Sequence, residues 1–298
     1  MANYYIPGFY CHYNVNMALL KLMREEPQMF YKDIKIGGIF DNFPNCIWNG
    51  GNIIFGKISF AKEQIKIMND FNSLGIPLRL TMTNPLIEEK DCYDRYANYI
   101  MENLHNGFNQ VIVASPILEQ YIREKYPKYP IIRSIIAANN ENNVYYDDSN
   151  KYFMSVLNRQ KNNDLEFLEK IKNKNKIEIL VNETCVSNCK RHYEHYENFG
   201  KSQTLMEKQM NINVKCDYEK NRKYRYKIKQ ESPTCISRKK IKEIYEPMGF
   251  NNFKLSGRIS FTPIILDYAN YFILPEWKDD FLSMILPFFV KDYNISFI

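Results

Sequence analysis

Short apolar runs recur along the chain and alternate with segments in which apolar residues return every three or four positions. Short continuous apolar runs are typical of strands covered on both faces, whereas the longer period is typical of amphipathic helices. The predicted strands span residues 3–10, 34–40, 77–83, 110–115, 131–137, 151–157, 176–182 and 252–257. The predicted helices span residues 15–26, 61–75, 93–107, 115–127, 163–174 and 237–249. The polar stretch 138–150 predicts a loop with at most one short helical turn.

Eight strands that alternate with helices predict an α/β fold, a (β/α)₈ TIM-like barrel, with an open doubly wound sheet as the alternative. No GxGxxG sequence follows the first strand and no Walker A sequence is present, so nothing favours a nucleotide-binding version. We expect the barrel to occupy residues 1–274 and a C-terminal tail to occupy residues 275–298. The longest apolar run, 281–290, is too short for a membrane span, which needs about 20 residues.

One connection is much longer than the others. Nearly 70 residues separate the strand that ends near Asn182 from the strand that starts near Asn252, whereas a connection with its helix needs roughly 20 to 30. The sequence therefore predicts an insertion, residues 183–250, between the last two strands. In a barrel this position is at the mouth, where active sites are found.

Composition and charge indicate an ordinary globular protein and do not favour a particular function. Of 298 residues, 45% are hydrophobic and 25% are charged, as in an ordinary globular protein. The formal net charge of +6 is too small to indicate a nucleic-acid partner by itself. The first residues lack the basic and apolar pattern of a signal peptide, and seven cysteines without such a signal favour a reducing compartment. We therefore expect a cytoplasmic protein with no membrane span.

The cysteines are unevenly distributed. Four of the seven, Cys185, Cys189, Cys216 and Cys235, fall within the predicted insertion, together with two of the four histidines. Clustered thiolates in a reducing compartment suit zinc or an iron–sulfur cluster, and the alternative is a set of unrelated buried thiols. The irregular spacing, Cys-x₃-Cys and then two long gaps, favours a cluster over a zinc knuckle.

Several segments carry a family resemblance. LVNETCVSNCKRHYEHY (180–196) and NFKLSGR (252–258) resemble the collagenase-like "unknown-type" peptidase family, and most closely its stand-alone bacterial branch of iron–sulfur barrel proteins. FPNCIWNGG (43–51), RLTMTN (79–84) and YFMSVLNRQKNNDLEFL (152–168) are similar to further signatures of that branch. The resemblance extends over residues 3–272.

The resemblance implies a cofactor and a type of reaction. It implies a [4Fe–4S] cluster held by Cys185, Cys189, Cys216 and Cys235, with His195 as a possible replacement for one of the last two. It also implies oxygen-independent hydroxylation, which related proteins perform on ubiquinone precursors or on RNA bases. Lys190 departs from the pattern, because a proline usually follows the second cysteine.

Polar side chains follow most of the predicted strands, at the end where a barrel places its chemistry. As substrate-binding candidates we take Tyr10, His12, Asn42, Trp48, Asn49, Asn84 and Asn158, and Ser115 follows the fourth strand. Arg258 suits a carboxylate or phosphate group, because its planar fork binds two oxygens at once. Glu183 is a candidate proton carrier or an anchor for the cysteine loop. No GxSxG or HExxH sequence supports peptidase activity.

These observations favour an iron–sulfur enzyme that acts on a small polar or phosphorylated substrate, with an electron donor protein as a further partner. The first alternative is an RNA-modifying protein, because residues 215–230 interleave basic residues with tyrosines. The second alternative is a non-catalytic scaffold in which a cluster or a zinc ion is only structural.

Overall fold

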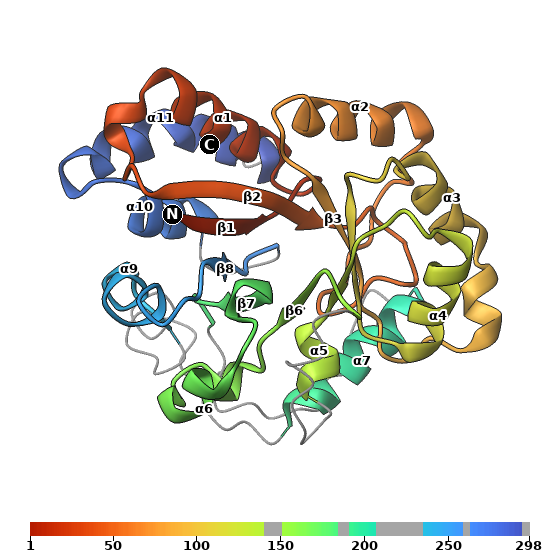
Figure 1. Cartoon of the computed structure of the whole chain (residues 1–298). Coiled ribbons are helices and arrows are strands. Elements are labelled where there is room, and N and C mark those ends of the chain that lie inside the picture. The colour runs from red at the N-terminus through yellow and green to blue at the C-terminus, as the bar shows by residue number, and fades with distance from the viewer. Residues whose placement is uncertain (140–150, 184–190, 207–234, 259–262, 294–298) are drawn as a thin grey trace.

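The computed structural model describes residues 1–139, 151–183, 191–206, 235–258 and 263–293. Eight parallel strands pair in chain order, and the last strand pairs with the first, so the sheet closes into a barrel (Figure 1). The closed barrel confirms the predicted (β/α)₈ architecture and excludes the open doubly wound sheet. The strands are β1 (Ala2–Pro7), β2 (Ile34–Asp41), β3 (Leu78–Met82), β4 (Gln110–Val113), β5 (Ile131–Arg133), β6 (Met154–Val156), β7 (Ile177–Leu180) and β8 (Asn252–Lys254).

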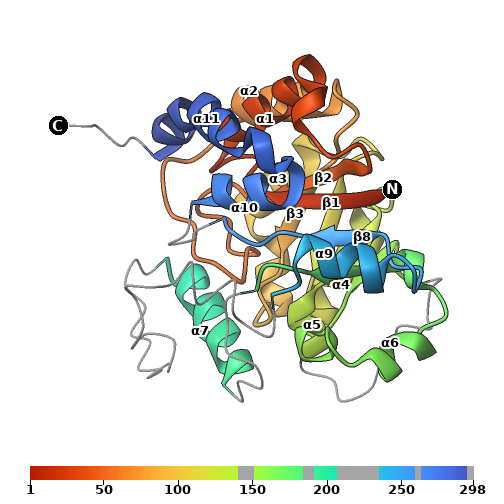
Figure 2. The same cartoon turned by 90° about the vertical axis from the view of Figure 1, so that its left-hand side faces the viewer.

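Helices surround the barrel on its outside (Figures 1 and 2). They are α1 (Tyr13–Glu25), α2 (Ala61–Asn72), α3 (Arg95–Asn103), α4 (Pro116–Lys125), α5 (Ile135–Asn139), α6 (Leu165–Lys170), α7 (His192–Thr204), α9 (Arg238–Lys240), α10 (Ile264–Phe272) and α11 (Lys278–Tyr293). Buried apolar residues of α1, α2, α3, α4, α6, α10 and α11 join those of the strands in one large core. Local signals set several boundaries: the Ser115 side chain caps α4 at the Leu118 N–H, and Gly75 adopts a φ of +75° after α2.

Two predicted elements differ from the structure. The run 131–137 is a strand only as far as Arg133, and the helix α5 begins at Ile135, because the same apolar residues can fill either kind of element. The predicted helix 237–249 consists of the short helix α9 and a π-helical turn, Ile241–Tyr245.

The C-terminal segment predicted as a tail contains a helix that is part of the packed fold. Phe281 and Ile285 of α11 are fully buried in the main core. The Asp292 carboxylate accepts hydrogen bonds from the backbone N–H groups of Asn14 and Val15, at 3.0 and 2.8 Å, and so caps the first turn of α1. Figures 1 and 2 show α11 lying beside α1, so the two ends of the chain stabilise each other. Within the described residues, no helix is both long and apolar enough to cross a membrane.

The described parts of the predicted insertion are Glu183, residues 191–206 with the helix α7, and residues 235–250 with α9 and the π-helical turn. Cys185, Cys189, Cys216 and the basic segment 215–230 lie outside the described residues. The insertion therefore contributes α7 to the described fold, and this helix lies toward the end of the barrel where the strands finish (Figure 2).

Candidate functional site

A cavity of about 340 Å³ opens at the carboxyl ends of the strands. Its wall combines strand residues, such as Thr81 and Lys254, with residues of the loops that follow the strands and with one side of α7. A site at this end of a barrel, built from several strand ends, is where (β/α)₈ enzymes bind their substrates. Of the residues predicted for the site, Glu183 and Arg258 line this cavity.

Arg258 is a buried cation in the cavity wall, with only 7% of its surface exposed. Its guanidinium donates to the Asn49 side-chain oxygen at 3.0 Å, the Thr81 hydroxyl at 2.6 Å and the Gly50 carbonyl at 3.0 Å. All three acceptors are neutral, and no carboxylate of the described residues forms an ion pair with it. Burial lowers the pKa of Arg258, and the more distant Asp41 carboxylate acts in the opposite direction. A buried cation without an anionic partner is costly, so this position suits an anionic ligand.

The loop between β2 and α2 holds Arg258 in place. Asn49 accepts from both Arg258 and the Thr81 hydroxyl, and its amide donates to the Asn52 carbonyl at 2.7 Å. Gly50 is required here, because a Cβ would lie 2.4 Å from the Thr83 carbonyl oxygen. The predicted candidate Asn49 therefore acts by positioning Arg258.

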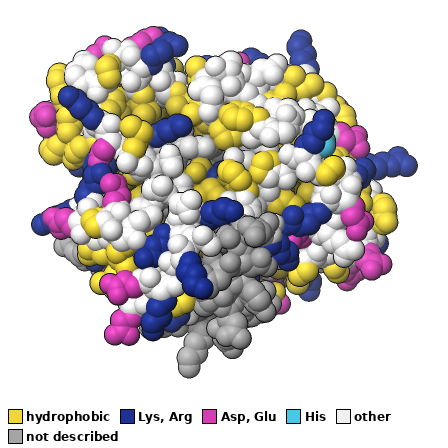
Figure 3. Space-filling view, in the orientation of Figure 1, with side chains coloured by type: hydrophobic (Ala, Val, Ile, Leu, Met, Phe, Trp, Pro, Cys, Tyr) yellow, Lys and Arg dark blue, Asp and Glu magenta, His cyan; other side chains and the backbone are white. Residues whose placement is uncertain are grey.

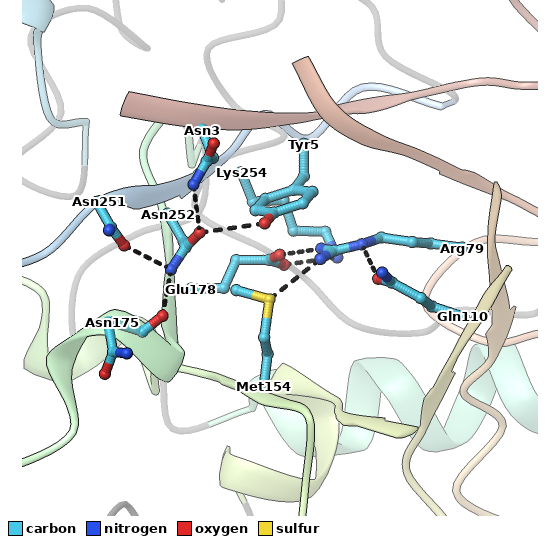
Figure 4. Close-up of polar contacts among 10 residues, drawn as sticks. All are labelled: Asn3, Tyr5, Arg79, Gln110, Met154, Asn175, Glu178, Asn251, Asn252 and Lys254. Atoms are coloured by element: carbon cyan, nitrogen blue, oxygen red, sulfur yellow. Dashed lines mark hydrogen bonds and ion pairs between the residues drawn. The ribbon is translucent and has the colours of Figure 1, made fainter. Parts of the chain in front are cut away.

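A group of charged side chains lies in the barrel interior next to the cavity (Figure 4). Lys254 lines the cavity, and its ammonium lies 3.2 Å from Glu178 and 4.1 Å from the centre of the Phe40 ring. Glu178 also forms a fully buried ion pair with Arg79. Burial lowers the pKa of Lys254, although the Glu178 carboxylate counteracts part of this effect. Lys254 thus adds a further, largely buried cation to the cavity wall.

The helix α7 supplies a less polar side of the cavity through His192, His195 and two aromatic residues. Burial lowers the pKa of His192 to about 2, with further contributions from Arg159 and His195, so His192 is neutral at physiological pH. Arg159 and Glu183 form an ion pair at 3.2 Å on the same side. This pair is balanced in charge, in contrast to Arg258.

Asn84, a predicted substrate-binding residue, tethers α7 to the barrel. Its amide donates to the Gly200 carbonyl at 3.2 Å and to the Thr204 hydroxyl at 3.0 Å. Gly200 allows this close approach, since a Cβ would lie 2.3 Å from the Asn84 side-chain oxygen. Gln203 adds a second tether through the backbone of Ile54.

The remaining predicted substrate-binding residues do not line the cavity, and their polar atoms contact the protein itself. His12 Nε2 donates to the Gly257 carbonyl at 2.8 Å, and the Asn42 amide donates to the Thr81 carbonyl at 2.9 Å. The Trp48 indole is fully buried and donates to the Asp91 carbonyl.

Two further candidates also lie away from the cavity. Asn158 caps a short 3₁₀ turn. Tyr10 lines a separate hollow of about 620 Å³ that borders α11. These side chains shape the mouth of the barrel and lie around the cavity rather than in it.

Cys235 is the one predicted metal ligand within the described residues. It lines a third hollow, and its sulfur lies 3.8 Å from the Tyr271 hydroxyl. Its backbone pairs with Asn182, directly after β7. No three His, Cys, Asp or Glu side chains of the described residues come together to hold a metal ion. The other three predicted ligands lie outside those residues.

Sequence reasoning missed Lys254, Thr81, Arg159 and His192 as cavity residues. For Lys254 a signal was present, since a charged residue inside an otherwise apolar strand has to find a partner in the interior. Arg79 and Glu178 carry the same signal in their own strands. The position of His192 depends on how α7 is tethered, which the sequence pattern does not reveal.

Comparison with known proteins reveals a similar fold and no matching sequence family. No protein-family model matches the chain, and no curated protein matches its sequence. The solved structure of the U32 peptidase Mk0906 superimposes with a TM-score of 0.52 over 86% of this chain and 93% of that chain, at 12% sequence identity. What the two share is the fold. The neighbour is described as a U32 peptidase, and the sequence motifs of this chain resemble a peptidase family.

Proposed function

We propose that this protein is an iron–sulfur enzyme that binds a small anionic substrate at the carboxyl end of its barrel. The observation that carries the proposal is Arg258, which is buried in the cavity wall and bonded only to neutral acceptors among the described residues. Oxygen-independent hydroxylation is the proposed type of reaction, with an electron-transfer protein as the partner. It rests on the resemblance in the sequence.

The position of Cys235 supports the proposed cofactor. Cys235 is partly exposed and pairs through its backbone with Asn182, and only two residues separate Asn182 from Cys185 in the sequence. Cys185, Cys189, Cys216 and Cys235 would hold the [4Fe–4S] cluster as thiolates. When bound, the cluster would supply one-electron chemistry beside the end of β7.

The protein's own side chains would bind and orient the substrate. Arg258 would bind its anionic group, since a guanidinium can donate two parallel hydrogen bonds to a carboxylate or phosphate. Glu183 lines the cavity and pairs with Arg159, so it can anchor the loop that follows β7 or carry a proton to and from the substrate. The helix α7 would limit the access of water to the cavity.

The cluster is tested by its iron and sulfide content. Protein purified without oxygen should contain about four irons and acid-labile sulfide per chain. Cys185→Ser should remove most of the iron, whereas Cys92→Ser should retain it, because Cys92 is buried in the main core beside α3 and its thiol donates to the Glu88 carbonyl. Stoichiometric zinc without sulfide would refute the proposal, and an equal loss of iron in both variants would indicate general instability.

The RNA-modifying alternative depends on residues 215–230, which lie outside the described residues. On the face shown in Figure 3, basic side chains are interspersed with acidic ones. The cavity, by contrast, is a described feature of a size that suits a small molecule. We therefore favour a small substrate over RNA and over a scaffold without a ligand.

A further inference from the structure

The interior of this barrel holds charges where (β/α)₈ barrels usually pack layers of branched apolar side chains. Arg79 on β3 and Glu178 on β7 have fully buried side chains. In the closed strand order these two strands lie on opposite sides of the barrel, so their ion pair spans its interior. Lys254 on β8 reaches the same carboxylate (Figure 4).

The Glu178 carboxylate forms ion pairs with two cations, Arg79 and Lys254. Apart from Glu178, the groups that Arg79 contacts within the part of the chain that the structure describes are neutral: the Gln110 side-chain oxygen at 2.7 Å, the Met154 sulfur at 3.1 Å and the Tyr5 ring at 3.3 Å. Arg79, Glu178 and Lys254 together therefore carry one net positive charge. Lys254, which is 13% exposed, is the member of the three that lines the cavity.

Arg258 places a second positive charge in the same cavity wall, and no carboxylate within the described ranges forms an ion pair with it. The other ion pair there, Arg159 with Glu183, is balanced. The Asp41 carboxylate accepts hydrogen bonds from the backbone N–H groups of Tyr10 and Cys11 and forms no ion pair with Arg258. Two cations that line one cavity repel each other, and an anion bound between them removes this repulsion.

We propose that Lys254 and Arg258 form the two halves of a binding site for a small, doubly charged oxyanion, either a phosphomonoester or a dicarboxylate. This inference rests on the proposed function and narrows its substrate class. The guanidinium of Arg258 supplies a planar fork for two oxygens, and the ammonium of Lys254 supplies a point charge. The cavity of about 340 Å³ admits a molecule of the size of a small metabolite.

The experiment is a calorimetric titration of the full-length protein, purified without oxygen, with sulfate, phosphate and nitrate at constant ionic strength. We expect the divalent anions to bind at least 10-fold more tightly than nitrate. Lys254→Met should reduce sulfate affinity at least 10-fold, because it leaves Arg79 and Glu178 as a neutral pair. Arg258→Lys should also weaken binding, because the fork is lost. Lys21→Met, an exposed substitution on α1, is the matched control and should change nothing.

A second measurement avoids reliance on a variant that fails to fold. Pyridoxal phosphate and borohydride label accessible lysine amines, and peptide mass spectrometry locates the label. In the wild-type protein, sulfate should protect Lys254 from labelling and leave Lys21 unprotected. Titration with glycerol phosphate and with succinate then distinguishes a phosphomonoester site from a dicarboxylate site.

Three results would overturn the inference: equal affinity for nitrate and sulfate, unchanged sulfate affinity in a folded Lys254→Met protein, or no protection of Lys254. Iron and sulfide are measured on the same samples. Protein that binds sulfate but contains no iron would refute the cluster and leave the anion site standing. Protein that contains a full cluster but binds sulfate no better than nitrate would refute the anion site and leave the cluster standing.

Discussion

The two halves of the barrel are built differently. In the first half, β1, β2, β3 and β4 contain 6, 8, 5 and 4 residues, and each is followed by a helix that packs on it. In the second half, β5, β6, β7 and β8 contain 3, 3, 4 and 3 residues. The register between β1 and β2 extends over six residue pairs, whereas β5 and β6 share two. Backbone pairing is therefore concentrated in the first half.

The candidate chemistry is distributed the other way. Glu183, Lys254 and Arg258 belong to the second half, and so does α7 with its histidines. The first half contributes positioning groups, such as Asn49 for Arg258 and Asn84 for α7. Elements that bind ligands are commonly drawn from the less stable parts of a fold, and well-paired elements hold them in place. The longer, better-paired strands and the charged candidate residues thus lie in different halves of this chain.

The ion pair between Arg79 and Glu178 joins the two halves, and breaking it should have the largest effect. Glu178→Gln leaves two buried cations without their carboxylate and should lower the free energy of unfolding by about 3–5 kcal/mol. Glu25→Gln, which removes an exposed ion pair with Lys21, should cost less than about 1 kcal/mol. Urea denaturation of both variants measures the difference. If the two variants lose similar free energies of unfolding, the buried Arg79–Glu178 pair contributes no more to stability than an exposed ion pair.

A matched pair of leucines tests whether packing differs between the halves. Leu80 on β3 is fully buried, whereas Leu180 on β7 lines the cavity. Leu80→Ala should cost about 2–5 kcal/mol, because it opens a new void in a filled core. Leu180→Ala should cost about half as much, because it enlarges a space that already exists. If denaturant titrations show that Leu180→Ala is the more destabilising substitution, packing is not looser around Leu180 than around Leu80.

His192 makes the second half sensitive to acid. Its pKa is about 2 in the folded protein, whereas a histidine in the unfolded chain has its ordinary value near 6.5. The unfolded chain therefore binds the additional proton between these values, and stability falls as the pH decreases below about 6.5. Between pH 7 and pH 5 the loss from this residue should be about 2 kcal/mol.

The test compares wild-type protein and His192→Gln at both pH values. Effects of all other groups are common to the two proteins, so the difference between the two losses isolates His192. Equal losses in the two proteins would mean that His192 carries no such penalty.

Removing a helix cap should give the smallest difference in stability between the two halves of the barrel. Ser115 caps α4 in the first half, and Ser237 caps α9 in the second. Ser115→Ala should cost about 1 kcal/mol, since it leaves the buried Leu118 N–H without its acceptor. Ser237→Ala should cost only a few tenths of that, because Ser237 is exposed and α9 is short. Thermal midpoints of the two variants, with Ser115→Thr as the control that keeps the hydroxyl, measure the contrast.

Much of the fold follows from local signals in the sequence. Eight apolar runs separated by helical patterns are enough to predict a barrel, because each strand buried on both faces needs a helix to cover it. Ser115 and Gly75 mark helix ends through their own backbone and side-chain chemistry. Glu183 and Arg258 could be placed at the mouth because each follows a strand, and all parallel strands end on the same side.

Other features depend on which residues meet once the barrel has closed. The period of a strand places Arg79 and Glu178 in the interior, but only closure of the sheet brings β3 and β7 opposite each other. His12, Asn42 and Asn84 also follow strands, yet their side chains bond to a neighbouring loop, strand and helix, respectively. The direction of a side chain after a strand end depends on the path of its loop and on what packs against it. Periodicity in the sequence therefore determined the elements and their order, whereas long-range packing decided which polar groups face the cavity.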